Sequence, residues 1–93
     1  MTVPVIAAFS RTPFSRAHKG MMKNMRPDDF GAEVVKHLMN KHLNLNEDLE
    51  DILLGCAYPE GEQGNNLGRL ISYLSNLSVK IPGSTTNRLC GSS

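Results

Sequence analysis

The sequence predicts an α/β fold with a mainly parallel sheet. Three stretches rich in apolar or β-branched residues are predicted as strands, at residues 3–9, 51–58 and 84–90. Two stretches with helical spacing of apolar residues lie between them, at residues 28–42 and 65–77. Strands that alternate with helices in this way are typical of parallel sheets with helical crossovers. The expected order of elements is therefore β-α-β-α-β.

The predicted strands differ in how strongly the sequence supports them. Residues 3–9 form the almost wholly apolar run VPVIAAF, which suits a strand buried on both faces. Pro4, near its start, fits the edge of a strand. Residues 51–58 contain the second buried run, ILLGCA. Residues 84–90 alternate poorly, but their two threonines favour extended structure.

Both predicted helices have a recognisable start and an apolar face. Pro27 suits the first turn of the first helix, and the two aspartates after it suit the positive end of the helix dipole. Apolar residues then recur every fourth position, at Phe30, Val34 and Leu38. Asn65 or Asn66 is the expected N-cap of the second helix. Its apolar face is formed by Leu67, Leu70, Ile71, Leu74 and Leu77.

The composition is that of one small globular domain. The chain has 93 residues, of which 40% are hydrophobic and 20% charged, with a formal net charge of +1. This balance argues against a nucleic-acid-binding protein, which normally carries a basic patch. No apolar run approaches the roughly 20 residues of a membrane span, and no signal-peptide pattern opens the chain. We therefore expect a cytoplasmic protein without a membrane span.

The two cysteines have different surroundings in the sequence. Cys90 follows the third predicted strand and precedes three small residues. If a helix followed, its free N–H groups and dipole would favour a thiolate at Cys90 and hold an oxyanion. The residues alone leave two possibilities open, a nucleophile and a buried structural thiol. Cys56 lies inside an apolar run and is expected to be a small buried hydrophobe.

No metal or phosphate site is expected. The three histidines have no metal-ligand spacing with a cysteine or carboxylate; they are His18, His37 and His42. The glycine-spaced residues 60–64 are not followed by Gly-Lys-Ser/Thr, and no G-x-G-x-x-G is present.

Four stretches of the chain together resemble the opening of a thiolase, either a 3-ketoacyl-CoA thiolase or an acetyl-CoA acetyltransferase. They occur in the order and at about the spacing of that family, and the resemblance covers essentially all 93 residues. The last stretch is the most specific, because NRLCGSS resembles the nucleophile motif of degradative thiolases. The four stretches are residues 5–14 (VIAAFSRTPF), 26–29 (RPDD), 52–64 (ILLGCAYPEGEQG) and 82–93 (PGSTTNRLCGSS).

The resemblance implies a layered αβαβα fold, of which residues 1–93 would form an incomplete N-terminal thiolase domain. It implies that Cys90 takes up the acyl group as a thioester and that its backbone N–H contributes to an oxyanion hole. The family's histidine and second cysteine belong to C-terminal Gly-His-Pro and Cys-x-Gly-Gly-Gly motifs, neither of which occurs in this sequence. We therefore expect that the 93-residue chain is a fragment of a longer protein and has no thiolase activity by itself.

The implied reaction is cleavage of a 3-ketoacyl-CoA by coenzyme A, as in fatty acid β-oxidation. Acyl-CoA and coenzyme A are the expected partners, no cofactor is expected, and the longer parent protein is expected to be a homodimer or homotetramer. Three alternatives stay open: condensation of two acetyl-CoA units, a non-catalytic scaffold or dimerisation element, and an unrelated small α/β protein with a structural cysteine.

Overall fold

A two-stranded parallel sheet covered on one face by a helix forms the centre of the molecule. The structure, a computed structural model, describes residues 2–93 apart from the side chain of Leu45. Strand β1 (Ile52–Gly55) pairs in parallel with strand β2 (Gly83–Thr86), with Ile52 opposite Gly83. The expected parallel arrangement is confirmed for these two strands.

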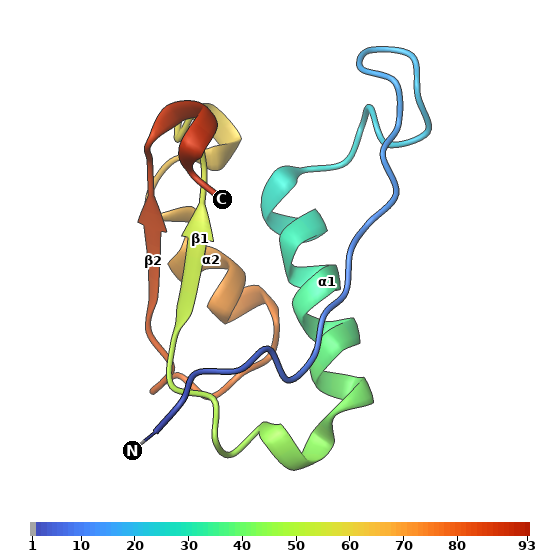
Figure 1. Cartoon of the computed structure of the whole chain (residues 1–93). Helices are drawn as coiled ribbons and strands as arrows, with labels where there is room; N and C mark the ends of the chain where they lie inside the picture. Colours follow the sequence, from blue (N-terminus) through green and yellow to red (C-terminus); the bar gives the residue numbers. More distant parts are fainter. Residues whose placement is uncertain (1) are drawn as a thin grey trace.

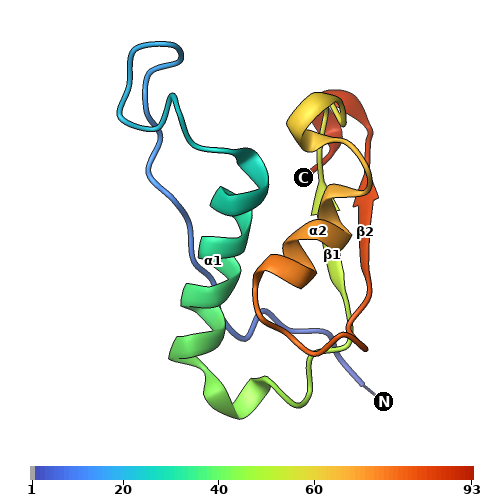
Figure 2. The same ribbon diagram turned by 180° about the vertical axis from the view of Figure 1, so that it is seen from behind.

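Helix α2 (Leu67–Leu74) is the crossover between the strands and packs on one face of the sheet, as Figure 2 shows. Helix α1 (Pro27–Lys41) packs against α2 (Figure 1). Three short 3-10 helices complete the elements, η1 (Leu43–Leu45), η2 (Gly61–Gln63) and η3 (Leu89–Gly91). The core therefore lies where the two helices and the covered face of the sheet meet.

The helix predictions are confirmed, with the second helix shorter than expected. α1 begins at Pro27 and carries two aspartates in its first turn. α2 begins after Asn66, whose side chain accepts a hydrogen bond from the backbone N–H of Arg69, so Asn66 is the N-cap. The chain leaves helical geometry by Asn76, whose φ is 59°. The predicted range of 65–77 is therefore longer at both ends than the observed helix α2.

The apolar residues of the core come from both helices, from β1 and from the residue that follows β1. Cys56, Leu67 and Ile71 form a buried cluster, against which Val35 and Leu54 pack. Apolar burial of this kind is the main favourable term in folding. The strongly amphipathic α2 joins the sheet to α1.

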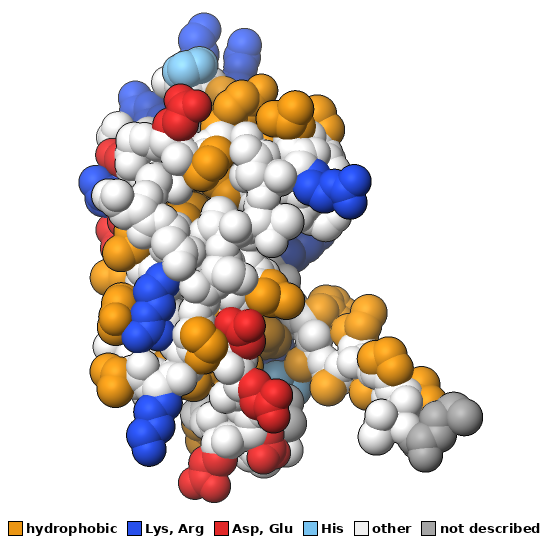
Figure 3. Space-filling view, turned by 90° about the vertical axis from the view of Figure 1, so that its left-hand side faces the viewer, with side chains coloured by type: hydrophobic (Ala, Val, Ile, Leu, Met, Phe, Trp, Pro, Cys, Tyr) orange, Lys and Arg blue, Asp and Glu red, His pale blue; other side chains and the backbone are white. Residues whose placement is uncertain are grey.

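The prediction of a buried strand at residues 3–9 is wrong. The segment has no regular secondary structure, and Val5, Ile6 and Phe9 are 80%, 88% and 86% exposed. It runs across one end of the sheet and then along α1 (Figure 1). Its apolar side chains project from the body of the molecule (Figure 3). A strand needs a neighbour for its backbone N–H and C=O groups, and within residues 2–93 the two strands pair with each other.

The second and third predicted strands are present, but within residues 2–93 their sheet is covered on one face and open on the other. Both strands alternate between half-buried and exposed residues, so that one face is open. Leu53 on that open face is 75% exposed. The strands are shorter than the predicted 51–58 and 84–90, because the paired ladder runs from Ile52 opposite Gly83 to Gly55 opposite Thr86. An apolar run indicates a preference for burial, but only packing partners provide the cover.

Candidate active-site cysteine

Cys90 lies just beyond the carboxyl end of β2. The chain leaves the strand at Thr86 and enters η3, in which Cys90 is the middle residue and is exposed. Because the strands are parallel, their carboxyl ends meet at one edge, and the Cys56 N–H donates to the Thr86 carbonyl at 3.0 Å there. The crevice outside this edge is where α/β sheets usually bind ligands.

The turn around Cys90 is held by side chains on both sides of it. Leu89 N–H donates to Asn87 Oδ1 at 2.9 Å. Arg88 N–H donates to Ser92 Oγ at 2.9 Å, and the Ser92 hydroxyl donates to the Leu89 carbonyl at 2.7 Å. Backbone bonds from Gly91 to Arg88 and from Ser92 to Leu89 close the 3-10 turn. The thiol is therefore presented on a compact turn rather than on an open chain end.

Leu89 gives this turn an unusual backbone conformation. Its φ is 51°, in the left-handed region that glycine tolerates and a leucine avoids. Such a conformation costs an L-residue about 1–2 kcal/mol. It persists only where the surroundings hold it, and this kind of strain clusters at functional sites.

Gly55, at the end of β1, is in close contact with the backbone of the same turn. A Cβ atom at this position would lie 2.7 Å from the carbonyl carbon of Ser92 and 3.2 Å from the nitrogen of Ser93. The backbone that follows Cys90 thus rests directly on the glycine. A residue with a side chain at position 55 would displace it.

A polar network anchors β2 upstream of the turn. Asn66 Nδ2 donates to the Gly83 carbonyl at 2.9 Å, and the Thr85 hydroxyl donates to Asn66 Oδ1 at 2.9 Å. The Thr85 oxygen in turn accepts the Gly68 N–H at 2.9 Å. The start of α2 is therefore tied to the strand that leads to Cys90. The sequence predicted Asn65 or Asn66 as the N-cap but not the bonds of Asn66 to β2, because a cap motif specifies only local partners.

Cys56 matches its expected structural role. It is 7% exposed and packs with Leu67 and Ile71. Although β1 and β2 are adjacent, both cysteines are free thiols, so the structure shows no disulfide between Cys56 and Cys90. The two thiols thus differ in access, with one in the core and one on the surface.

His37 and His42 line clefts that do not include Cys90. His37 lines a cleft of about 400 Å³ with Met22, Met25 and Phe30, and Cys90 is not among the lining residues. His42 lines two other clefts beside residues 5–9, again without Cys90. Within residues 2–93, no three His, Cys, Asp or Glu side chains gather as metal ligands would. In the same residues, no helix has the length and apolar character to cross a bilayer.

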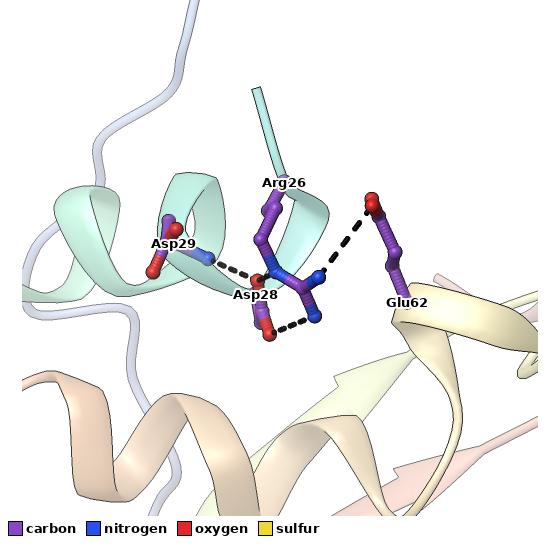
Figure 4. Close-up of polar contacts among 4 residues, drawn as sticks. All are labelled: Arg26, Asp28, Asp29 and Glu62. Carbon is purple, nitrogen blue, oxygen red and sulfur yellow. Dashed lines mark hydrogen bonds and ion pairs between the residues drawn. The ribbon is translucent and has the colours of Figure 1, made fainter. Parts of the chain in front are cut away.

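One charged group was missed by sequence reasoning. Arg26 donates to both carboxylate oxygens of Asp28, at 3.1 and 3.0 Å, and lies 3.5 Å from a Glu62 oxygen (Figure 4). Asp28 is buried and also accepts the Asp29 N–H at 2.8 Å. The group joins the start of α1 to η2, beyond the end of β1. The sequence indicated that the aspartates suit the helix dipole, but not that a distant loop would supply a third charge.

Hydrogen bonding and charge explain the ionisation of this group. The Arg26 hydrogen bonds hold the pKa of Asp28 below its ordinary value of 3.8, against an opposing effect of burial. The Asp29 N–H and the positive charge of Arg26 act in the same downward direction. In return, Asp28 raises the pKa of Arg26. The pair is therefore fully ionised at neutral pH.

Comparison with known proteins places these features in context. The family described as "Thiolase, N-terminal domain" matches residues 4–93. A 3-ketoacyl-CoA thiolase of Bacillus subtilis is 40% identical over 92 residues, which are 99% of this chain and 24% of that protein. A 3-ketoacyl-CoA thiolase of Colwellia psychrerythraea is 40% identical over 94 residues, covering 100% of this chain and 24% of the relative.

A relative with a different printed substrate is about as similar. The beta-ketoadipyl-CoA thiolase of Acinetobacter baylyi is 40% identical over 84 residues, covering 89% of this chain and 21% of that protein. The chain thus spans about a quarter of the length of the curated relatives that it matches.

Proposed function

The chain belongs to the thiolase family, and we propose that it is the N-terminal part of a longer thiolase in which Cys90 carries the acyl group. The proposed reaction cleaves a 3-ketoacyl-CoA with coenzyme A to acetyl-CoA and a shortened acyl-CoA. One observation carries the assignment to Cys90. Of the two thiols, it alone is exposed, and it lies on a strained turn at the carboxyl end of a parallel strand.

In the proposed first half-reaction, the Cys90 thiolate attacks the 3-keto carbon of the substrate. The bond between C2 and C3 then breaks, and its electron pair passes to C2 of the leaving acetyl-CoA unit, which takes up a proton. The shortened acyl group stays on Cys90 as a thioester. Splitting one difficult step into two easier ones is the benefit of such a covalent intermediate.

In the second half-reaction, the sulfur of coenzyme A attacks the thioester carbonyl and Cys90 leaves as a thiolate. The proton that the coenzyme A thiol loses balances the one that acetyl-CoA gained. By family resemblance, a histidine and a second cysteine outside these 93 residues move the protons. The proposal needs no resident cofactor.

Four finer features of the proposed function stay predictions: the acyl chain of the substrate, the direction of the reaction, the oligomeric state and the location. The relatives' printed names include 3-ketoacyl-CoA and beta-ketoadipyl-CoA thiolases, which supports an acyl-CoA substrate of undefined chain. The condensing direction uses the same nucleophile and is the alternative activity. The expected homodimer or homotetramer and the cytoplasmic location are likewise predictions.

Trapping the acyl-enzyme tests the assignment of the nucleophile. The full-length protein is mixed with a 3-ketoacyl-CoA without free coenzyme A, quenched in acid, digested and analysed by mass spectrometry. We expect the added acyl mass on the peptide that contains Cys90. Cys90→Ala should lose the label and the activity, whereas Cys56→Ala should keep the label. A thioester on Cys56, or full activity in Cys90→Ala, would contradict the proposal.

A further inference from the structure

We propose that Ser92 is a positioning residue for Cys90. It would hold the turn that carries the thiol through two parts of the same residue, its hydroxyl and its backbone carbonyl. The inference rests on the proposed function of Cys90 as the acyl-accepting residue. It adds a residue whose role neither the sequence motif nor the family match assigns.

The hydroxyl of Ser92 closes the turn around Cys90. It accepts the Arg88 N–H at 2.9 Å and donates to the Leu89 carbonyl at 2.7 Å. Both bonds span Cys90, because they join Arg88 and Leu89, which precede the thiol, to Ser92, which lies two residues after it. The hydroxyl is the partner of the Arg88 N–H, and it adds a second bond to the Leu89 carbonyl, which also accepts the Ser92 N–H at 3.1 Å.

The backbone carbonyl group of Ser92 packs closely against Gly55 of β1. Gly55 has no side chain there, and a Cβ atom would fall 2.7 Å from the Ser92 carbonyl carbon. Backbone atoms on both sides of this contact leave little room for adjustment. Ser92 thus places the turn relative to the sheet, while its hydroxyl shapes the turn internally.

The strain at Leu89 explains why such support is needed. With a φ of 51°, Leu89 occupies a conformation that its own preference disfavours. Without the hydroxyl, the Arg88 N–H loses its partner and the Leu89 carbonyl keeps only the Ser92 N–H, so that fewer bonds oppose relaxation of the turn toward ordinary geometry. A nucleophile must be held within about half an ångström of its productive position, so relaxation of this turn would slow acyl transfer.

Ser93 provides a matched comparison. It is the neighbouring serine and is exposed, and within residues 2–93 its side chain makes no hydrogen bond that compares with those of Ser92. Three variants of the full-length protein separate the roles: Ser92→Ala removes the hydroxyl, Ser92→Thr keeps it, and Ser93→Ala removes the neighbouring one.

Two reactions of Cys90 are measured in each variant. The first is acylation by a 3-ketoacyl-CoA, from which kcat and KM are obtained. The second is alkylation by iodoacetamide, a small reagent that needs an accessible thiolate but no oriented substrate. Thermal unfolding of each variant confirms that it is folded.

We expect Ser92→Ala to slow acyl transfer from the substrate but not alkylation of Cys90. Because a misplacement of about 1 Å costs about 100-fold in rate, Ser92→Ala should lower kcat by about 10- to 100-fold. KM and the alkylation rate should both change by less than about 2-fold, since neither binding nor thiol access depends on the turn's fine geometry. Ser92→Thr should restore most of kcat, and Ser93→Ala should behave like the unchanged protein.

Three outcomes would overturn the inference. In the first, kcat is unchanged in Ser92→Ala. In the second, kcat and alkylation fall in parallel, which would place the effect on ionisation or folding. In the third, Ser92→Thr is as slow as Ser92→Ala. Failure of the proposed function is recognised separately, because the unchanged protein would then form no thioester on Cys90 and both proposals would fall.

Discussion

At the scale of single residues, Asp28 is the clearest electrostatic contributor. Its side chain is 9% exposed, and it forms a two-pronged pair with Arg26. Because its pKa is lowered in the folded chain, it contributes stability that is present above its ordinary pKa of 3.8. That contribution is lost as the pH falls through the lower folded-state pKa.

We therefore expect Asp28→Asn to lower the free energy of unfolding at pH 7 by about 1–2 kcal/mol. The difference from the unchanged chain should shrink as the pH is lowered below 3.8, where the unchanged Asp28 also becomes protonated. Urea unfolding at a series of pH values measures both effects. Asp29→Asn is the control, because Asp29 is exposed and has no such partner in Figure 4. Equal losses in the two variants would contradict the prediction.

Asn66 contributes to stability as the N-cap of α2, and the neighbouring Asn65 provides a control for its replacement. Asn65 and Asn66 both have φ values of 57°, so replacement by alanine brings similar backbone strain at either position. Only Asn66 caps α2 and bonds to Gly83 and Thr85. Loss of an N-cap typically costs about 1 kcal/mol.

Asn66→Ala should accordingly destabilise the chain by about 1–2 kcal/mol more than Asn65→Ala does. Thermal or urea unfolding of the two variants, compared at one temperature, gives this difference. Equal stabilities would show that the network between α2 and β2 contributes nothing beyond local strain.

At the scale of secondary-structure elements, two glycines set the distance between α2 and β2. A Cβ atom on Gly68 would lie 2.8 Å from the Ser84 carbonyl carbon, and one on Gly83 would lie 2.6 Å from the Gly68 carbonyl carbon. Each glycine therefore meets backbone of the opposite element. Gly31 in α1 differs, since its nearest neighbours are the side-chain atoms of Ile71.

The comparison of two helical glycines follows from this geometry. Gly68→Ala should destabilise by about 1–3 kcal/mol, because the helix and strand must move apart. Gly31→Ala meets a side chain that can change rotamer, and it gains about 1 kcal/mol of helix propensity, so its net effect should be near zero. Unfolding curves of both variants measure the contrast. A Gly68→Ala variant as stable as Gly31→Ala would refute the close approach of α2 to β2.

At the scale of the whole molecule, much apolar surface lies open. Segment 3–9 is largely exposed, Leu53 is 75% exposed on the uncovered sheet face, and within residues 2–93 the sheet consists of two strands. Apolar patches of this extent normally mark surfaces that are covered by other parts of a protein or by partners. Two paired strands with one covered face also provide little cooperative stability.

The 93-residue chain expressed alone should therefore be poorly stable, tend to associate, and lack thiolase activity. Each missing acid–base group typically contributes roughly 100- to 10,000-fold, so Cys90 without them should show only background reaction. Cleavage of a 3-ketoacyl-CoA and the thermal transition of residues 1–93 are the measurements. Turnover near that of a full-length thiolase, with cooperative monomeric unfolding, would show that the catalytic partners lie within these residues.

The sequence by itself determined the features that depend on neighbouring residues. Helical spacing and start signals predicted α1 almost to its ends, and an apolar run correctly predicted that Cys56 would be buried. The alternation of apolar segments predicted three mainly parallel strands joined by helices, and the second and third of these, with the helix between them, are confirmed. The thiolase motif around Cys90 was also visible in the sequence, because it is a contiguous run of residues.

The tertiary structure alone decided whatever depends on residues distant in the chain. Segment 3–9 is not part of the sheet. A strand forms only beside another strand that can bond its backbone, and an apolar composition does not reveal whether such a neighbour is present. The tertiary structure also brought Glu62 to Arg26 and placed the backbone of Ser92 against Gly55. A local pattern carries no information about such approaches, since their distances are set by how α1, α2 and the two strands pack together.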